Sequence, residues 1–188
     1  MKRRTLVLGA GAAGLVPGLG HAAKDKKEKE REEIRQAGQK ALAAVYKVQP
    51  SARKAVESAA GYAAFSNFGM KVLVAGSGTG KGVAVNNKTK ATTYMRMAEV
   101  QAGLGFGIKK FQLVWVFENA SALDKFVNSG WEIGAQASAT AKTGDTGAAY
   151  QGAVSVSPGV WLYQVSGDGL ALELTAKGTK YYKDSDLN

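Results

Sequence analysis

The sequence predicts an α+β protein that is mainly β: an antiparallel β barrel or sandwich with an N-terminal helical segment and one inserted helix. Two observations support this fold class. From Gly61 onward, short segments rich in Val, Phe, Tyr and Thr alternate with turn signals, as in antiparallel sheets with short connections. Before Gly61, and again after Ser121, apolar residues recur at steps of three and four, as they do on one face of a helix.

Residues 1–22 have the layout of a secretory signal peptide. A basic start is followed by an apolar stretch from Thr5 to Leu19, and the small residues Gly20 and Ala22 suit a cleavage site. We therefore expect cleavage near Ala22 and an exported protein of the periplasm or cell envelope. An arginine pair before a weakly hydrophobic stretch is also seen in twin-arginine signals, so the route, Sec or twin-arginine, stays open.

Composition argues against an enzyme. The chain has no Cys, and its single histidine, His21, is removed by the expected cleavage. Without Cys or His, the chain lacks the usual ligands of a zinc site and the base of a Ser-His-Asp triad, so we expect no catalytic residues, no metal and no cofactor. The net charge is +10, and the 22 basic and 15 acidic residues left after cleavage give +7. This surplus favours anionic surfaces, but no run of basic residues indicates nucleic acid.

Residues 23–49 form a leader that is first charged and then weakly amphipathic. Its first part alternates in sign, with acid and base pairs at helical spacing such as Lys29 and Glu33. Its second part has a narrow apolar face that includes Ile34, Ala41 and Val45. Two interpretations follow: the second half packs on the domain, or the helix lies on a membrane.

Residues 50–188 are expected to form one β-rich domain. Ser51 is the expected N-cap of a short helix that Gly61 ends. Ser121 to Asp124 matches a capping box, which predicts the inserted helix, and Gly130 ends it. The expected strands are 62–68, 70–77, 80–86, 90–96, 99–108, 111–117, 132–142, 147–156, 160–166, 169–176 and 178–182.

Two sets of glycines recur at every second position, which places each set on one face of a strand. A face without side chains allows strong sheet curvature or the close approach of a helix or an aromatic ring. It could equally form a slot for a ligand. The glycines are Gly76, Gly78, Gly80, Gly82, Gly103, Gly105 and Gly107.

Four lysines are candidates for contact with lipid head groups. Lys88 and Lys90 flank a hairpin tip that begins at Asn86-Asn87, and Lys109-Lys110 is expected at another turn. If these tips point the same way, each lysine adds roughly 1 kcal/mol of attraction to an anionic membrane. Two acids near the other end of the sequence, Asp184 and Asp186, are expected to be solvated.

Several segments together resemble the SYLF-domain family, also described as a lipid-binding and actin-binding domain family. The resemblance covers about residues 41–188, keeps the family's order and is greatest for exported bacterial members. The matching segments are 61–65, the glycine positions 76–82, 102–107, 111–119, 122–126, 130–135 and 178–182.

The resemblance implies a non-catalytic module that binds acidic phospholipids, with actin binding in some members. An exported bacterial protein meets no actin, so we do not expect that role to transfer. The primary hypothesis is therefore an exported module that contacts anionic phospholipid surfaces of the cell envelope. The alternatives are a structural or protein-interaction protein of the envelope that uses the glycine face, and a carrier of a small apolar ligand.

Overall fold

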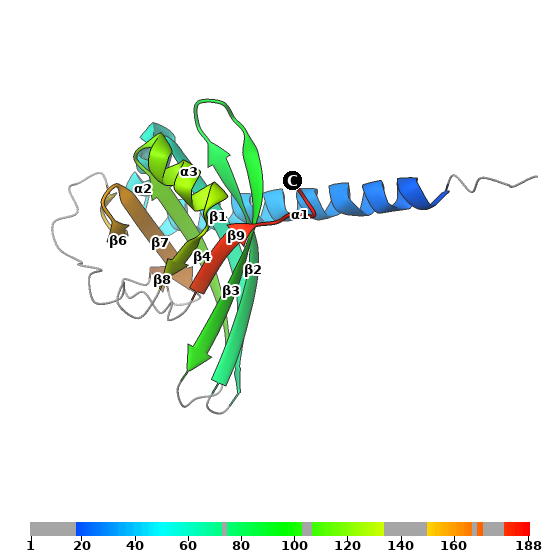
Figure 1. The fold of residues 1–188 in the computed structure, drawn as a ribbon. Coiled ribbons are helices and arrows are strands. Elements are labelled where there is room, and N and C mark those ends of the chain that lie inside the picture. Colours follow the sequence, from blue (N-terminus) through cyan, green and yellow to red (C-terminus); the bar gives the residue numbers. More distant parts are fainter. Residues whose placement is uncertain (1–17, 73–74, 103–106, 134–149, 167–168, 171–178) are drawn as a thin grey trace, which may run out of the picture.

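The computed structural model describes residues 18–72, 75–102, 107–133, 150–166, 169–170 and 179–188 (Figure 1). Its helices are α1 (Gly18–Val48), α2 (Ser51–Ser58) and α3 (Ala120–Asn128). Its strands are β1 (Gly61–Val72), β2 (Ala75–Asn86), β3 (Thr92–Ala102), β4 (Gly107–Phe117), β5 (Trp131–Ile133), β6 (Val154–Ser157), β7 (Val160–Ser166), β8 (Gly169–Leu170) and β9 (Thr179–Lys183).

The described strands form one antiparallel sheet in the order β5-β9-β3-β2-β1-β4-β7-β6, with β8 paired to β7. The long strands β1 to β4 twist and curl the sheet into a half-barrel (Figure 1). Helix α1 crosses the outer face of the sheet and extends past its edge, while α3 lies on the other side. The predicted α+β, mainly β class is confirmed.

Each face of the sheet packs a separate core. On the inner face, the aromatic side chains of Phe65, Trp115 and Tyr181 gather around Phe126 of α3, with ring centroids 5.0 to 6.3 Å apart. On the outer face, Ala41 and Val45 of α1 are fully buried against strand residues that alternate with those of the inner core. Burial of both faces explains why apolar and small residues fill the middle strands almost continuously.

The leader is an integral layer of the fold. Ile34, Ala41 and Val45 are all buried, as the interpretation of docking on the domain requires. The first part of α1 is exposed from residue 23 to residue 29 and projects beyond the sheet (Figure 1). Helix α1 also includes residues on both sides of the expected cleavage position, since it begins at Gly18.

The strand boundaries correct the prediction in two places. The sequence predicts three strands between residues 62 and 86, but the structure has the two long strands β1 and β2, and Gly69 and Gly78 form an in-register pair between them. The predicted segments 90–96, 99–108 and 111–117 likewise form only β3 and β4. Glycine therefore sits inside these strands and does not end them. Residues 150–153, predicted as strand, form a turn before β6.

The helix ends also differ from the prediction. Asn119, not Ser121, is the N-cap of α3, and its side chain accepts a hydrogen bond from the Ala122 N–H at 2.9 Å. Helix α2 begins after Pro50 with no side-chain cap, and Gly61 belongs to β1. Gly130 follows α3 with φ of 75°, the conformation expected of a glycine after a helix.

Candidate functional site

The turn between β2 and β3 presents Lys88 and Lys90 at one end of the sheet, and we call residues 87–90 the lysine tip. The Asn86 side chain accepts hydrogen bonds from the Lys88 and Thr89 N–H groups at 2.9 and 3.0 Å. Its backbone C=O accepts from the Lys90 N–H at 2.8 Å, and Lys90 has φ of 59°. The turn is therefore fixed by hydrogen bonds to the side chain and the carbonyl of Asn86, and the predicted hairpin tip is confirmed.

The lysine tip is anchored to α2. The Asn87 side chain donates to the C=O groups of Val56 and Ala59 at 2.7 and 2.9 Å, which satisfies carbonyls at the end of that helix. Both lysines are exposed, and neither has an ion-pair partner in the part of the chain that the structure describes. Their charges are therefore available to an external anion.

Lys109 and Lys110 do not lie at a turn, which corrects the prediction. They belong to β4, where they pair with Gly69 and Phe68 of β1. The lysine tip follows Asn86, whose partner on β1 is Gly61, eight residues from Gly69. Eight residues of strand extend about 26 Å. The four predicted lysines therefore form two separate pairs toward opposite ends of the long strands.

Among the predicted glycine positions, Gly82 has a packing role. A Cβ on Gly82 would lie 2.4 Å from both the Ala64 carbonyl oxygen and the Phe65 ring. Gly82 therefore allows the close approach of the Phe65 ring, which is the packing interpretation of the glycine face. Gly76, Gly78 and Gly80 lie on the same strand and Gly107 begins β4, while Gly103 and Gly105 lie outside the described residues.

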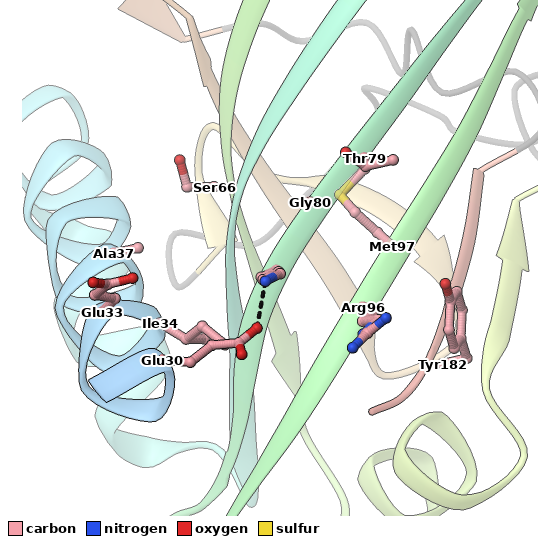
Figure 2. Close-up of a pocket in the computed structure, with 11 residues that line it drawn as sticks. Glu30, Glu33, Ile34, Ala37, Ser66, Thr79, Gly80, Arg96, Met97 and Tyr182 are labelled. Carbon is pink, nitrogen blue, oxygen red and sulfur yellow. Dashed lines mark hydrogen bonds and ion pairs between the residues drawn. The ribbon is translucent and has the colours of Figure 1, made fainter. Parts of the chain in front are cut away.

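A groove of about 740 Å³ lies between α1 and the outer face of the sheet (Figure 2), and we call it the α1 groove. Its helix wall carries Glu30 and Glu33, and its sheet wall carries Lys81 and Arg96. The Lys81 ammonium donates a hydrogen bond to Glu30 across the groove. Acidic and basic groups are thus separated onto opposite walls.

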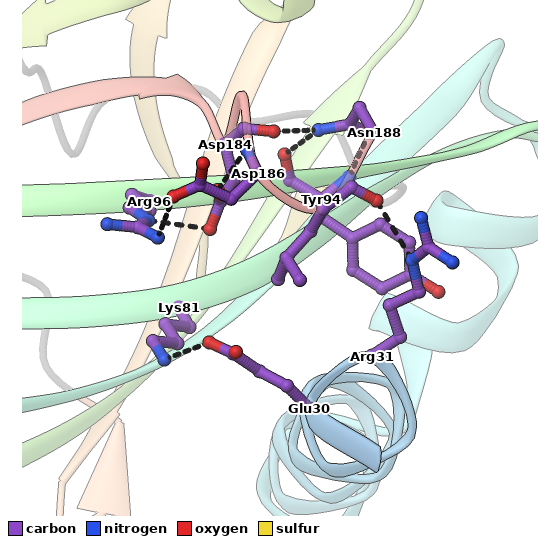
Figure 3. A network of polar contacts seen from close by, with 9 residues as sticks. Glu30, Arg31, Lys81, Tyr94, Arg96, Asp184, Asp186 and Asn188 are labelled. Atoms are coloured by element: carbon purple, nitrogen blue, oxygen red, sulfur yellow. Dashed lines mark hydrogen bonds and ion pairs between the residues drawn. The ribbon is translucent and has the colours of Figure 1, made fainter. Parts of the chain in front are cut away.

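Arg96 is held by residues that follow β9 (Figure 3). Its Nε donates to Asp184 Oδ2 at 2.6 Å, and this hydrogen bond raises the pKa of Arg96 above its ordinary value. The Asp184 side chain is 1% exposed, which corrects the expectation of a solvated acid, and it also accepts from the Asp186 N–H. Asp186 is exposed, as predicted, and lies 3.4 Å from Arg96.

Residues 184–188 connect this network to α1. Arg31 of α1 donates to the Leu187 C=O at 2.9 Å, and the Leu187 side chain is buried against Ile34 and Tyr94. Asn188 both donates to the Tyr94 C=O and accepts from its N–H, each at 2.9 Å. The segment therefore links α1 to β3 beside the α1 groove.

The sequence prediction did not include Lys81, Glu30 or Arg96 among its site residues. One signal for the pair was available. Once the turn is placed after Asn86, counting back equally along both strands of a hairpin sets Lys81 opposite Arg96. No comparable signal brings Glu30 to Lys81, because that contact depends on how α1 packs.

No group of three or more His, Cys, Asp or Glu side chains among the described residues could hold a metal ion. None of the helices that the structure describes combines the length and the apolar composition needed to cross a membrane.

Comparison with known proteins gives two matches. Residues 98–188 match the family model of Ysc84, described as a Las17-binding protein actin regulator. Beta cell expansion factor A of Aeromonas veronii is 35% identical over 149 residues, which cover 78% of this chain and 54% of that protein. The match therefore spans about half the length of this relative.

Proposed function

Because the chain belongs to the Ysc84 (SYLF) family through residues 98–188, we propose that it is an exported, non-catalytic protein that binds anionic phospholipid surfaces of the cell envelope. The family is one of lipid- and actin-binding domains. Of these two ligands, an exported protein meets lipid and does not meet actin. The proposal therefore keeps the lipid role and assigns the contact to the lysine tip.

The observation that carries the proposal is the pair of exposed lysines on a fixed turn. Lys88 and Lys90 are exposed on an anchored hairpin end, so little backbone order has to be gained when they meet a surface. Each contributes roughly 1 kcal/mol against an anionic leaflet. Together they contribute about 2 kcal/mol, which corresponds to roughly a thirtyfold increase in binding.

The leader supplies less of this contact than an amphipathic membrane helix would. The apolar residues of its second half, Ala41 and Val45 among them, are buried in the outer core. Its exposed first part alternates basic and acidic residues, from Lys24 to Glu33. An approach led by the lysine tip needs no part of the fold to open.

Vesicle sedimentation tests the proposal. The full chain is expected to sediment with vesicles of phosphatidylglycerol and phosphatidylcholine, and to remain in solution with phosphatidylcholine alone. Raising the salt concentration weakens the binding, because it screens exposed charges. The double variant Lys88→Gln/Lys90→Asn reduces binding about thirtyfold, where asparagine is chosen because it tolerates the positive φ at position 90.

The matched control is Lys180→Gln/Lys183→Gln, which removes the same charge from exposed positions on β9. It is expected to bind nearly as well as the parent. Equal binding to neutral vesicles, or equal losses in both double variants, contradicts the assignment to the lysine tip. Retention of the protein by an envelope protein, with indifference to lipid, supports the interaction alternative instead. Mass spectrometry of the protein from cells, beginning at residue 23, tests export.

A further inference from the structure

We propose that the α1 groove binds a zwitterion that carries a primary ammonium and a phosphate group, as phosphoethanolamine does. Four charged side chains line it: Glu30 and Glu33 on the helix wall, Lys81 and Arg96 on the sheet wall (Figure 2). The charges of these four side chains are separated in space, and Arg96 is also paired with Asp184 and Asp186 outside the groove lining. Such a groove orients a ligand with a positive and a negative end.

The sheet wall is a row of hydrogen-bond donors. Ser66 pairs with Lys81, Lys81 with Arg96, and Arg96 with Tyr182, so these four side chains form one column across β1, β2, β3 and β9. All four line the groove. Neighbouring strands lie about 5 Å apart, a spacing at which one phosphate group can contact both Lys81 and Arg96.

Two like charges directly opposite each other on neighbouring strands destabilise a sheet. Here Lys81 faces Arg96 in that way. Lys81 has Glu30 as its carboxylate partner, and Arg96 has Asp184 and, at 3.4 Å, Asp186. Asp184 is buried and fixes the Arg96 guanidinium in place. The groove therefore presents a guanidinium oriented before any ligand arrives, as recognition of phosphate requires.

A zwitterion can enter without leaving a charge unpaired. The Lys81 side chain is 51% exposed, so its ion pair with Glu30 contributes little stability. When the ligand phosphate contacts Lys81, the ligand ammonium takes the place of Lys81 at Glu30. Glu33, one helical turn from Glu30, is a second acceptor for the ammonium.

The size of the groove and its remaining walls suit a small molecule. Its volume of about 740 Å³ falls within the range of known small-molecule sites, roughly 300 to 1,000 Å³. Ile34 and Ala37 of α1 form apolar wall beside the charged groups. These side chains can cover the short carbon chain that joins ammonium to phosphate.

Calorimetric titration of the full chain with phosphoethanolamine tests the site. We expect saturable binding of phosphoethanolamine. Inorganic phosphate, ethanolamine and phosphocholine are each expected to bind with at least tenfold lower affinity. Phosphocholine is the sharpest comparison, since its quaternary ammonium cannot donate hydrogen bonds to Glu30 or Glu33. Equal binding of inorganic phosphate, or no saturable binding of phosphoethanolamine, overturns the proposal.

Two single variants locate the site. Glu33→Gln and Lys81→Gln are each expected to weaken phosphoethanolamine binding about tenfold, and neither side chain is buried. The controls Glu57→Gln on α2 and Lys183→Gln on β9 make the same charge changes at exposed positions outside the groove and are expected to bind as the parent does. If both groove variants bind as the parent does, the ligand lies elsewhere and the proposal is wrong.

A vesicle-binding experiment distinguishes two sources of the ligand, a lipid head group and a free small molecule. Recruitment to phosphatidylethanolamine in phosphatidylcholine, lost in Lys81→Gln, supports the site and identifies a lipid head group. Calorimetric binding without recruitment supports the site and identifies a free small molecule. This test is separate from the proposed function, because both lipids are net neutral and Lys88→Gln/Lys90→Asn is expected to leave phosphoethanolamine binding unchanged.

Discussion

Gly82 is the position where the absence of a side chain matters most. It pairs with Phe65 of β1, and a Cβ there would lie 2.4 Å from the Phe65 ring and from a backbone oxygen. We expect Gly82→Ala to lower the free energy of unfolding by about 3 kcal/mol, because the backbone atom cannot move aside. Urea denaturation followed by circular dichroism measures the loss.

Gly38→Ala is the matched control for this prediction. Gly38 lies in α1, and its added Cβ would meet a Val83 methyl group at 3.0 Å, a contact that a small side-chain shift relieves. Alanine also favours the helix by up to about 1 kcal/mol. Gly38→Ala is therefore expected to change stability by no more than about 1 kcal/mol. Similar losses in both variants would mean that the glycine at position 82 has no special packing role.

Tyr163 is fully buried, and its hydroxyl has no hydrogen-bond partner among the described residues. A buried hydroxyl without a partner costs free energy. We therefore expect Tyr163→Phe to raise the free energy of unfolding by about 1 kcal/mol at neutral pH. A loss of stability in this variant, measured by the same denaturation, would indicate a partner for the hydroxyl.

The same side chain makes stability depend on alkaline pH. Burial raises the pKa of Tyr163 to about 12 in the folded protein, from 10.0 when it is unfolded and exposed. Between pH 10 and about 12 the folded state keeps the Tyr163 proton while the unfolded state loses it. The free energy of unfolding is therefore unaffected by this group below pH 10 and falls as the pH rises from 10 to about 12. Tyr163→Phe is expected to lose less stability than the parent across this interval.

At the scale of the elements, the start of α3 gives a prediction that separates two possible caps. Asn119→Ala removes the side chain that accepts from the Ala122 N–H, and is expected to cost about 1 kcal/mol. That loss corresponds to a fall of about 2 to 4 °C in melting temperature. Ser121→Ala removes the cap that the sequence pattern favours and is expected to have little effect. The reverse order of effects would contradict the observed cap.

The difference at α3 shows why helix ends are hard to predict locally. Asn119 and Ser121 are both residue types that cap helices. Asp124, three residues after Ser121, completes a capping-box pattern that favours Ser121. The path of the chain decides between them. β4 ends at Phe117, and the helix begins at Ala120, which leaves Asn119 in the extended conformation that a cap requires.

The long strands show the same limit for sheets. The β composition of residues 61–117 predicts strands correctly, and the turn after Asn86 follows from its Asn-Asn signal. Gly69 and Gly78 are ordinary break signals in isolation, yet they face each other within one continuous ladder. Pairing between strands compensates for the low strand propensity of glycine, and that compensation cannot be seen from one segment alone.

At the scale of the whole molecule, the sequence predicts the fold class and the lysine tip but not the α1 groove. The tip is local, since Lys88 and Lys90 lie within one turn. The groove joins Glu30 of the leader to Lys81 in the middle of the sheet, and its Arg96 is held by Asp184 from the segment after β9. Only the packing of α1 against the sheet brings them together.

The packing of α1 on the sheet predicts which N-terminal truncations keep the domain folded. The fragment 24–188 lacks residues 1–23 and keeps every α1 side chain that the structure describes as buried, so it is expected to match the full chain in stability within about 0.5 kcal/mol. The fragment 50–188 lacks α1 and exposes the outer core around Val114 and Val116. We expect it to aggregate or to unfold at much lower urea concentration.

A single substitution tests the same point without shortening the chain. Val45→Ala removes two methyl groups from a fully buried position on α1, which is expected to cost about 2 kcal/mol. Lys47→Ala, two residues further along the same helix, changes an exposed side chain and is expected to cost little. If α1 were only an appended leader, neither substitution would change global unfolding, and the fragment 50–188 would be as stable as the full chain. A large effect of Val45→Ala alone makes α1 part of the folded domain, so its apolar face can meet a membrane only if that domain opens.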